Sequence, residues 1–305
     1  MGGGLHARWC AVRMGTRVSK VGIEVSNAAG RLYIVATPIG NLDDISARAI
    51  EVLRTVDRVA AEDTRHSGRL LMHLAIDRPM LSLHEHNEAE AAQRVIAHLS
   101  AGESLALVSD AGTPLISDPG YGLVCRCHEQ GIEVVAVPGP SALIAALSVS
   151  GLPTDRFRFE GFLPRRQQAR LTHLQSLLNE TVTLVFYESS HRILDTLQDM
   201  SDVFGASRHA VVGRELTKLH ETVLSAPLGD LLERVRADEN QRKGEFVVLL
   251  AGADAAVDAS SMDTDALLSV LLEQLPLRQA ANLAARISGK KKNLLYRRAL
   301  ELNGR

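Results

Sequence analysis

The chain has 305 residues, of which 46% are hydrophobic and only 4% are aromatic, so it can form two domains with aliphatic cores. Its three cysteines, Cys10, Cys125 and Cys127, show neither a disulfide framework nor the spacing of zinc ligands. No apolar run reaches the roughly 18 to 20 residues that a membrane span needs. These features argue against a disulfide scaffold and a membrane-spanning protein, and they predict a cytoplasmic protein.

The formal net charge of −2 conceals a segregation of charge along the chain. Residues 275–305 contain eight Lys or Arg and one Glu, a local charge of +7, so the other 274 residues carry −9. A basic segment on a mildly acidic body favours contact with a polyanion such as nucleic acid. The surface of a solvated helix is the alternative explanation.

Residues 1–30 lack the apolar segment of a secretory signal, and we expect them to form a disordered extension. From residue 31 onward, short apolar runs alternate with helical patterns, which is typical of a parallel sheet covered by helices. Five helices are expected to end near Val56, Leu74, Leu99, Gln130 and Ser148. The strands before them are expected at residues 31–36, 57–61, 80–83, 105–108 and 132–137.

A second α/β unit is expected after a connector at residues 151–155. Because two strands follow one another between residues 209 and 225, its sheet should be mixed. We expect its strands at residues 158–162, 181–187, 209–213, 221–225 and 246–251, and its helices at residues 167–179, 191–203 and 227–237. The predicted fold is therefore two α/β domains, with a parallel N-terminal sheet, a mixed C-terminal sheet and a small helical appendage. The predicted divisions are residues 31–150, 151–252, an acidic linker and helix at 253–275, and a basic helix-turn-helix-like segment at 276–305.

The loop at residues 109–120 contains two Gly, two Pro and two Asp directly after a buried strand. It is longer than the roughly two to six residues of an ordinary strand-to-helix turn, and ligands of open α/β sheets bind at such strand ends. We therefore expect a ligand loop, with residues 110–113 touching the ligand and residues 117–120 starting the next helix. The chain has no glycine fingerprint of a dinucleotide-binding or phosphate-loop protein, which disfavours both classes.

Five motifs occur in order at the ends of predicted strands, at residues 33–42, 61–65, 109–120, 138–142 and 186–189. Together they resemble the tetrapyrrole-methylase superfamily, and specifically its ribosomal RNA branch, the small-subunit methyltransferase I group. The resemblance extends over about residues 31–302. It implies S-adenosylmethionine bound between two α/β domains of a homodimer. It also implies 2′-O-methylation of a decoding-centre cytidine, cytidine 1402, with 16S rRNA or the assembled small subunit as substrate.

The resemblance also implies which residues bind the cofactor. For the three implied residues of the second domain, Tyr187, Leu216 and Phe246, packing in the hydrophobic core is an equally good explanation. The carboxylate of Asp110 suits an amine or hydroxyl groups, because it only accepts hydrogen bonds when ionised. The implied cofactor residues are Pro38, Ile39, Gly40, Asp110, Ala111, Gly112, Thr113, Ser141 and Ala142 in the first domain, and Tyr187, Leu216 and Phe246 in the second.

Methyl transfer to a ribose hydroxyl requires positioning of the hydroxyl and an acceptor for its proton. For each candidate base, a helix cap or a structural hydrogen bond is the competing role. The candidates are Glu62, Asp63, His84, Glu85 and Glu188. His84 and His86 have no matched third ligand nearby in the sequence, so we predict no metal.

RNA contacts are expected from basic side chains at two places. Arg65 is interpreted as a clamp for phosphate or carboxylate oxygens, because a guanidinium binds them in a bidentate fashion. The C-terminal segment resembles a helix-turn-helix-like appendage whose cations would neutralise phosphates. A hairpin packed on the body with a charged outer face is the alternative. The cations concerned are Lys290, Lys291, Lys292, Arg297 and Arg298.

Two other functions are compatible with the pattern. The first is a methyltransferase for a porphyrin or corrin precursor, because one scaffold can serve many substrates. The basic C-terminal segment argues against it, since an acidic tetrapyrrole would need cations in the cleft. The second is a non-catalytic RNA-binding factor for ribosome assembly, which predicts RNA binding that is indifferent to S-adenosylmethionine.

Overall fold

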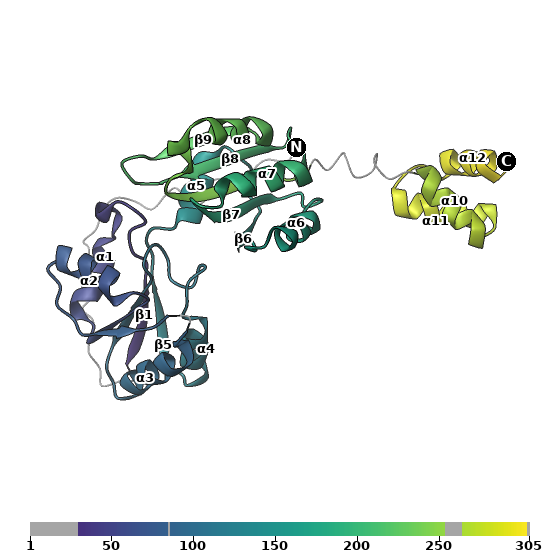
Figure 1. Ribbon diagram of the computed structural model, residues 1–305. Helices are drawn as coiled ribbons and strands as arrows, with labels where there is room; N and C mark the ends of the chain where they lie inside the picture. The colour runs from purple at the N-terminus through teal and green to yellow at the C-terminus, as the bar shows by residue number, and fades with distance from the viewer. Residues whose placement is uncertain (1–29, 85, 254–263, 304–305) are drawn as a thin grey trace, which may run out of the picture.

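The computed structural model describes residues 30–84, 86–253 and 264–303. It contains two α/β lobes and a group of C-terminal helices (Figure 1). This confirms the predicted fold of a parallel sheet, a mixed sheet and a helical appendage. The expected disordered extension lies outside the described residues except for Gly30, and so does the part of the predicted acidic linker at residues 254–263.

The first sheet is parallel, with strand order β3-β2-β4-β1-β5. The central strand β4 is buried along its whole length, as expected for an apolar strand covered on both faces. Each observed strand overlaps a predicted one. The strands are β1 (Arg31–Val35), β2 (Arg58–Ala61), β3 (Met80–Ser82), β4 (Leu105–Val108) and β5 (Glu133–Val137).

Helices cover both faces of this sheet. On one face, α1 (Ala47–Thr55) and α2 (Thr64–His73) bury Leu53 and Leu70 against β1 and β2. On the other face, α3 (Glu88–Ser100) and α4 (Tyr121–Glu129) bury Leu99 and Leu123 against β4. The neighbouring strands β1 and β4 thus lead to helices on opposite faces. Their carboxyl ends form the topological switch point at which open α/β sheets bind ligands.

The short elements and caps around this sheet follow from local chemistry. The 3-10 helix η1 (Leu42–Asp44) precedes α1, and the hydroxyl of Ser46 caps α1 by accepting a 3.1 Å hydrogen bond from the Ala49 amide. Such a cap satisfies one of the amides that the first turn of a helix leaves without a partner. It therefore fixes where the loop after β1 ends.

The second sheet is mixed, with strand order β6-β7-β10-β8-β9. Only β6 and β7 are parallel to one another, and the remaining neighbouring pairs are antiparallel. The strands are β6 (Phe157–Phe162), β7 (Thr183–Ser189), β8 (His209–Arg214), β9 (Thr222–Pro227) and β10 (Glu245–Leu250). One face is covered by α6 (Gln167–Ser176), α7 (Ile193–Phe204) and α8 (Leu228–Ala237), and the 3-10 helix η2 (Glu239–Arg242) follows α8.

The helix α5 (Ala142–Ser150) follows the last strand of the first sheet but packs on the second sheet. Its Leu143 and Leu147 join a core with Val185, Val211 and Val247, on the face opposite α6, α7 and α8. One polypeptide segment therefore connects the two lobes through packing as well as through the backbone. The division at residue 150 remains a prediction.

The C-terminal helices α10 (Thr264–Gln274), α11 (Leu277–Ser288) and α12 (Lys292–Asn303) share a small core that includes Leu268, Ala284 and Leu295. The break between α11 and α12 lies at Gly289, where φ is 68°, a left-handed conformation that favours glycine at a helix end. The segment at 276–305, predicted to be helix-turn-helix-like, thus contains two helices that are separated at Gly289. Within the described residues, no helix has the length and apolar character needed to cross a bilayer.

Candidate active site

A cleft of about 380 Å³ lies between the two lobes. Its first wall consists of the loops that follow β1, β2, β4 and β5, at the switch-point edge of the parallel sheet. Its second wall comes from the ends of β6, β7 and β8, the loop after β8 and the start of β10. The volume falls in the range of about 300 to 1,000 Å³ that is usual for small-molecule sites.

Hydrogen bonds between loops hold the cleft together. Thr37, after β1, forms an isolated bridge with Gly112, after β4, and the Thr113 hydroxyl donates to the Pro140 carbonyl at 3.0 Å. Across the lobes, the Leu143 amide donates to the Tyr187 hydroxyl at 3.2 Å. Three of the first-lobe loops and the second lobe are thus fixed to one another by short polar contacts.

Left-handed backbone occurs on both walls of the cleft. In the loop after β4, φ is 73° at Leu115 and 70° at Ser117; in the loop after β8, φ is 50° at Glu215 and 66° at Thr217. A residue other than glycine in this region costs on the order of 1 to 3 kcal/mol, and such strain concentrates at ligand sites. The surrounding structure therefore holds both loops in backbone conformations that residues other than glycine rarely adopt.

Ten of the twelve predicted cofactor residues line this cleft. Tyr187 is half-buried, and burial raises the pKa of its phenol. Leu216 and Phe246 are buried and belong to hydrophobic cores, so each of them both packs in a core and forms part of the cleft wall. The ten residues are Ile39, Asp110, Ala111, Gly112, Thr113, Ser141, Ala142, Tyr187, Leu216 and Phe246.

Pro38 and Gly40 are not among the residues that line the cleft. Gly40 lies where the two lobes meet, because a Cβ at this position would come within 2.4 Å of Lys218 Cγ and 2.8 Å of the Thr217 hydroxyl. The neighbouring Asn41 amide donates to that hydroxyl at 3.2 Å. Gly40 thus permits a close approach between the lobes.

On the first-lobe wall of the cleft, three carboxylates, from Glu62, Asp110 and Asp118, line it together. The pKa of Asp118 is raised to about 6, chiefly by burial, which outweighs a hydrogen bond from Ser109 that lowers it; the charges of Glu62 and Asp110 add to the rise. A carboxylate with a pKa near neutrality in a cleft is a characteristic general-base candidate.

The expectation that residues 117–120 only start the next helix is wrong for Ser117 and Asp118, which both line the cleft. The helix α4 begins at Tyr121, after the left-handed Gly120. Asp118 follows Asp110 in the same loop, and this second carboxylate was the signal available in the sequence. Its proximity to Glu62 depends on how the strands are ordered in the sheet.

Glu188 lines the cleft, but its carboxylate is engaged in the second lobe. Oε1 accepts a hydrogen bond from the Ser189 amide at 2.8 Å. Oε2 accepts one from the Thr196 hydroxyl at 2.7 Å and forms an ion pair with Arg192 at 3.3 Å. Its side chain is fully buried. These contacts assign Glu188 to holding β7 against α7 and leave no oxygen unengaged for proton transfer.

Asp63 caps α2 by accepting a 2.8 Å hydrogen bond from the Arg65 amide. Hydrogen bonding to the Arg65 guanidinium holds the pKa of Asp63 below its usual value. Neither residue lines the cleft, and the Arg65 side chain is 88% exposed. Asp63 therefore has the structural role of a cap, whereas Arg65 remains accessible to a partner.

His84 follows β3, at the edge of the sheet, and is not among the cleft residues. Its Nδ1 atom is buried without a hydrogen-bond partner in the described part of the chain. Glu85, another base candidate, lies outside the described residues. In the described ranges, no group of three or more His, Cys, Asp or Glu side chains is arranged to hold a metal.

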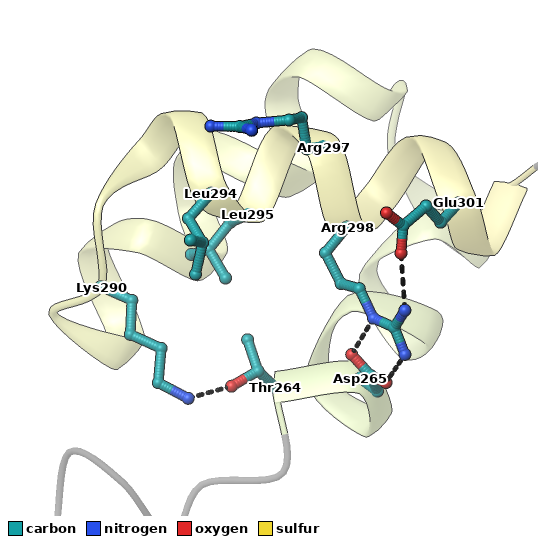
Figure 2. Close-up of a pocket in the computed structure, with 8 residues that line it drawn as sticks. All are labelled: Thr264, Asp265, Lys290, Leu294, Leu295, Arg297, Arg298 and Glu301. Atoms are coloured by element: carbon teal, nitrogen blue, oxygen red, sulfur yellow. Dashed lines mark hydrogen bonds and ion pairs between the residues drawn. The ribbon is translucent and has the colours of Figure 1, made fainter.

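Figure 2 shows three of the C-terminal cations, Lys290, Arg297 and Arg298, and two of them are engaged within the helical group. Arg298 pairs with Asp265 through Nε at 2.8 Å and with Glu301 at 2.6 Å, and Lys290 donates to the Thr264 hydroxyl. These contacts connect α10 to α12 and to the turn before it. Arg297 extends from α12 away from the paired side chains. The two engaged cations therefore have a role inside the helical group that the charge pattern did not predict.

Two family models match the chain. Residues 31–232 match the tetrapyrrole (corrin/porphyrin) methylases, and residues 258–303 match the RsmI C-terminal HTH domain. The protein named ribosomal RNA small subunit methyltransferase I from Pseudomonas aeruginosa PAO1 is 56% identical over 280 residues, covering 91% of this chain and 99% of the relative. The protein of that name from Escherichia coli O157:H7 is 54% identical over 278 residues, covering 91% and 97%.

Solved structures resemble the two lobes at the level of fold. A cobalt precorrin-4 methyltransferase has a TM-score of 0.58 at 17% identity, covering 75% of this chain and 98% of that one. Diphthine synthase has a TM-score of 0.56 at 16% identity, covering 73% and 90%. The family model covers the first lobe and the second lobe as far as α8, at residues 31–232, and the relatives match almost end to end. The chain belongs to the tetrapyrrole methylase family, within its ribosomal RNA small subunit methyltransferase I group, and is a methyltransferase.

Proposed function

We propose that this protein transfers the methyl group of S-adenosylmethionine to the ribose 2′-hydroxyl of cytidine 1402 in 16S rRNA. The observation that carries the proposal is the match, over 91% of the chain, to relatives named as small-subunit rRNA methyltransferases. The basic segment at residues 275–305 supports an RNA substrate, because cations there can neutralise phosphates.

The chemistry of the cleft fits S-adenosylmethionine. Gly112 has φ of 82°, and among the described residues beyond its chain neighbours the atoms nearest to where its Cβ would stand are Ile39 Cγ2 at 3.3 Å and the Pro140 carbonyl oxygen at 3.8 Å, so the backbone can approach a ligand closely. Asp110 can accept hydrogen bonds from an amine or from ribose hydroxyls. Ala142 and Leu216 add apolar walls. When bound, the cofactor supplies an electrophilic methyl group on a sulfonium; this chain has to orient it and exclude water.

We propose that Asp118 accepts the proton of the ribose hydroxyl, with Glu62 beside it as the second acidic group. A pKa of about 6 leaves Asp118 mostly ionised at neutral pH but still basic enough to attract a proton. Positioning of the hydroxyl against the methyl donor contributes the other part of the rate enhancement.

We propose that Lys291, Lys292 and Arg297 contact RNA phosphates, and that Lys290 and Arg298 hold the helices that present them. Contacts to phosphate position a substrate without reading its sequence.

A homodimer is also proposed, since α5 exposes Ile144 and Val149, each 54% exposed, beside its buried face. Sedimentation analysis measures the oligomeric state directly.

The decisive experiment incubates the protein with methyl-labelled S-adenosylmethionine and small ribosomal subunits from a strain that lacks the modification. Label at the 2′-oxygen of one cytidine is expected, and parallel reactions with naked 16S rRNA identify which form is the substrate. Cofactor binding without transfer to ribose would contradict the proposal. RNA binding that is unchanged by S-adenosylmethionine, with no transfer, would favour a non-catalytic assembly factor.

A further inference from the structure

An exposed aromatic ring stands at the mouth of the cleft. Phe162, the last residue of β6, lines the cleft and is 55% exposed. Its ring meets that of Tyr187 edge to face, with 5.6 Å between centroids, and Tyr187 also meets Phe159 at 4.9 Å. Phe162 is therefore supported from behind by other rings while much of its surface faces water.

An irregularity in β6 aims this ring at the cleft. Phe159 pairs with Val185 and Phe162 pairs with Tyr187, so three steps along β6 match two steps along β7. In a regular strand, residues three apart point to opposite faces, whereas the extra residue of a β-bulge restores a common face. Without the bulge, Phe162 would point to the face covered by α6, α7 and α8.

The bulge depends on Gly161, whose φ is 66°. A Cβ at this position would lie 3.4 Å from the Ser117 hydroxyl, so β6 abuts the loop after β4 here. Asp118 is the next residue in that loop, and its charge contributes to the raised pKa of Tyr187. The exposed Phe162 ring and the acidic side chains of the cleft therefore lie at the same opening of the cleft.

We propose that Phe162 is the platform on which the base of the methylated nucleotide stacks. This inference rests on the proposed function. A nucleotide inside folded RNA has to leave its stack before an enzyme can reach it, and an aromatic side chain replaces the lost stacking partner. Every base has a π-face, so the platform holds the nucleotide without selecting its sequence. A base on Phe162 leaves its ribose next to the loop that carries Asp118.

The test compares Phe162→Ala and Phe162→Trp with Phe157→Ala as the matched control. Phe157 lies in the same strand and is 40% exposed, but it is not among the cleft residues. The measurements are kcat and KM for small ribosomal subunits and the Kd for S-adenosylmethionine. Phe162→Ala is expected to lower kcat/KM about 10- to 100-fold, mainly through KM, whereas Phe162→Trp retains stacking and stays within about 3-fold. Phe157→Ala should behave like the unaltered protein.

An unchanged Kd for S-adenosylmethionine in all three variants would show that the cleft is folded. The platform is overturned if Phe162→Ala keeps its kcat/KM, if Phe162→Trp loses as much as Phe162→Ala, or if Phe157→Ala loses equally. A loss that appears equally in the cofactor Kd would also overturn it, because the ring would then support the cofactor site. Failure of the proposed function differs from these outcomes: the unaltered protein would bind the cofactor and methylate no RNA, which would overturn both proposals.

Discussion

The backbones of Thr37 and Gly112 exchange two hydrogen bonds: the Thr37 amide donates to the Gly112 carbonyl at 2.8 Å, and the Gly112 amide donates back at 3.1 Å. The buried Thr37 hydroxyl donates a third hydrogen bond, to the Ser109 carbonyl at 3.1 Å. These bonds join the loops after β1 and β4, the two strands that flank the switch point. The protein's own hydrogen bonds therefore hold this edge of the cleft.

Replacing Thr37 with Val should weaken this edge. Valine keeps the shape of threonine but removes the donor to Ser109, and losing a buried hydrogen bond of this kind costs about 1 to 3 kcal/mol. We expect a lower free energy of unfolding in urea and weaker binding of S-adenosylmethionine. Thr37→Ser, which keeps the hydroxyl, should lose less on both measures. Equal behaviour of the two variants would show that the hydroxyl has no role.

The rate of methyl transfer should depend on the ionisation of Asp118. Since its pKa is raised to about 6, kcat should rise with pH through this value and level off above it. Asp118→Asn should lower kcat by about 10²- to 10⁴-fold and remove the inflection. Asp63→Asn is the control, because this cap lies outside the cleft. An inflection near pH 6 that persists in Asp118→Asn would assign the proton to another group.

The same ionisation should affect stability. In the unfolded chain, Asp118 has the ordinary aspartate pKa of 3.8, whereas in the folded protein its pKa is about 6. The free energy of unfolding therefore falls as pH rises between these values and stays lowered above them. Asp118→Asn should have a higher Tm than the unaltered protein at about pH 8, and the difference should close as the pH approaches 4. A difference that grows towards low pH would contradict the raised pKa.

The fold could be predicted from sequence because most strands are compact apolar runs bounded by polar, Gly or Pro residues; β6, which contains Arg158 and Glu160, is an exception. The loops that line the cleft on the first lobe could be predicted because consecutive parallel strands end at one edge of a sheet. The packing of α5 on the second sheet could not be predicted from sequence, because a helix that is apolar on most sides can pack on either sheet. The engagement of Glu188 by Thr196 and Arg192, and of Arg298 by Asp265, depends on contacts that spacing does not reveal.

The C-terminal cations should have two different functions, RNA binding for Lys291 and Lys292 and stabilisation of the helices for Arg298. Lys291→Ala and Lys292→Ala should weaken RNA binding and reduce the slope of log affinity against log salt by about 0.7 to 0.9 for each lost phosphate contact. Arg298→Ala should instead lower the thermal stability of the helical group, because Asp265 and Glu301 lose their partner. Titrations at several salt concentrations measure the slope, with the cofactor Kd as the control. A larger change of slope for Arg298→Ala than for the lysine variants would refute this division.

The ion pair between Arg170 and Asp199 should be the most sensitive charged contact of the second lobe. Arg170 Nε lies 2.6 Å from Asp199 Oδ2, and both side chains are almost fully buried. Asp199→Ala would leave a buried guanidinium without its partner, which costs about 3 to 5 kcal/mol. Asp202→Ala, on the same helix but exposed, should change the free energy of unfolding by no more than about 0.5 kcal/mol. Similar denaturation midpoints for the two variants would contradict this difference.

The position of α5 has a consequence for dividing the molecule. A cut after Ser150 would leave an N-terminal fragment ending in a helix whose partners, Val185, Val211 and Val247, are all in the other fragment. That fragment would expose Leu143 and Leu147 and would tend to aggregate. A cut between β5 and α5 would leave α5 in the same fragment as the second sheet, on which it packs. Complementation of two separately produced halves should therefore succeed when the chain is opened near Gly139 and fail when it is opened at Gly151.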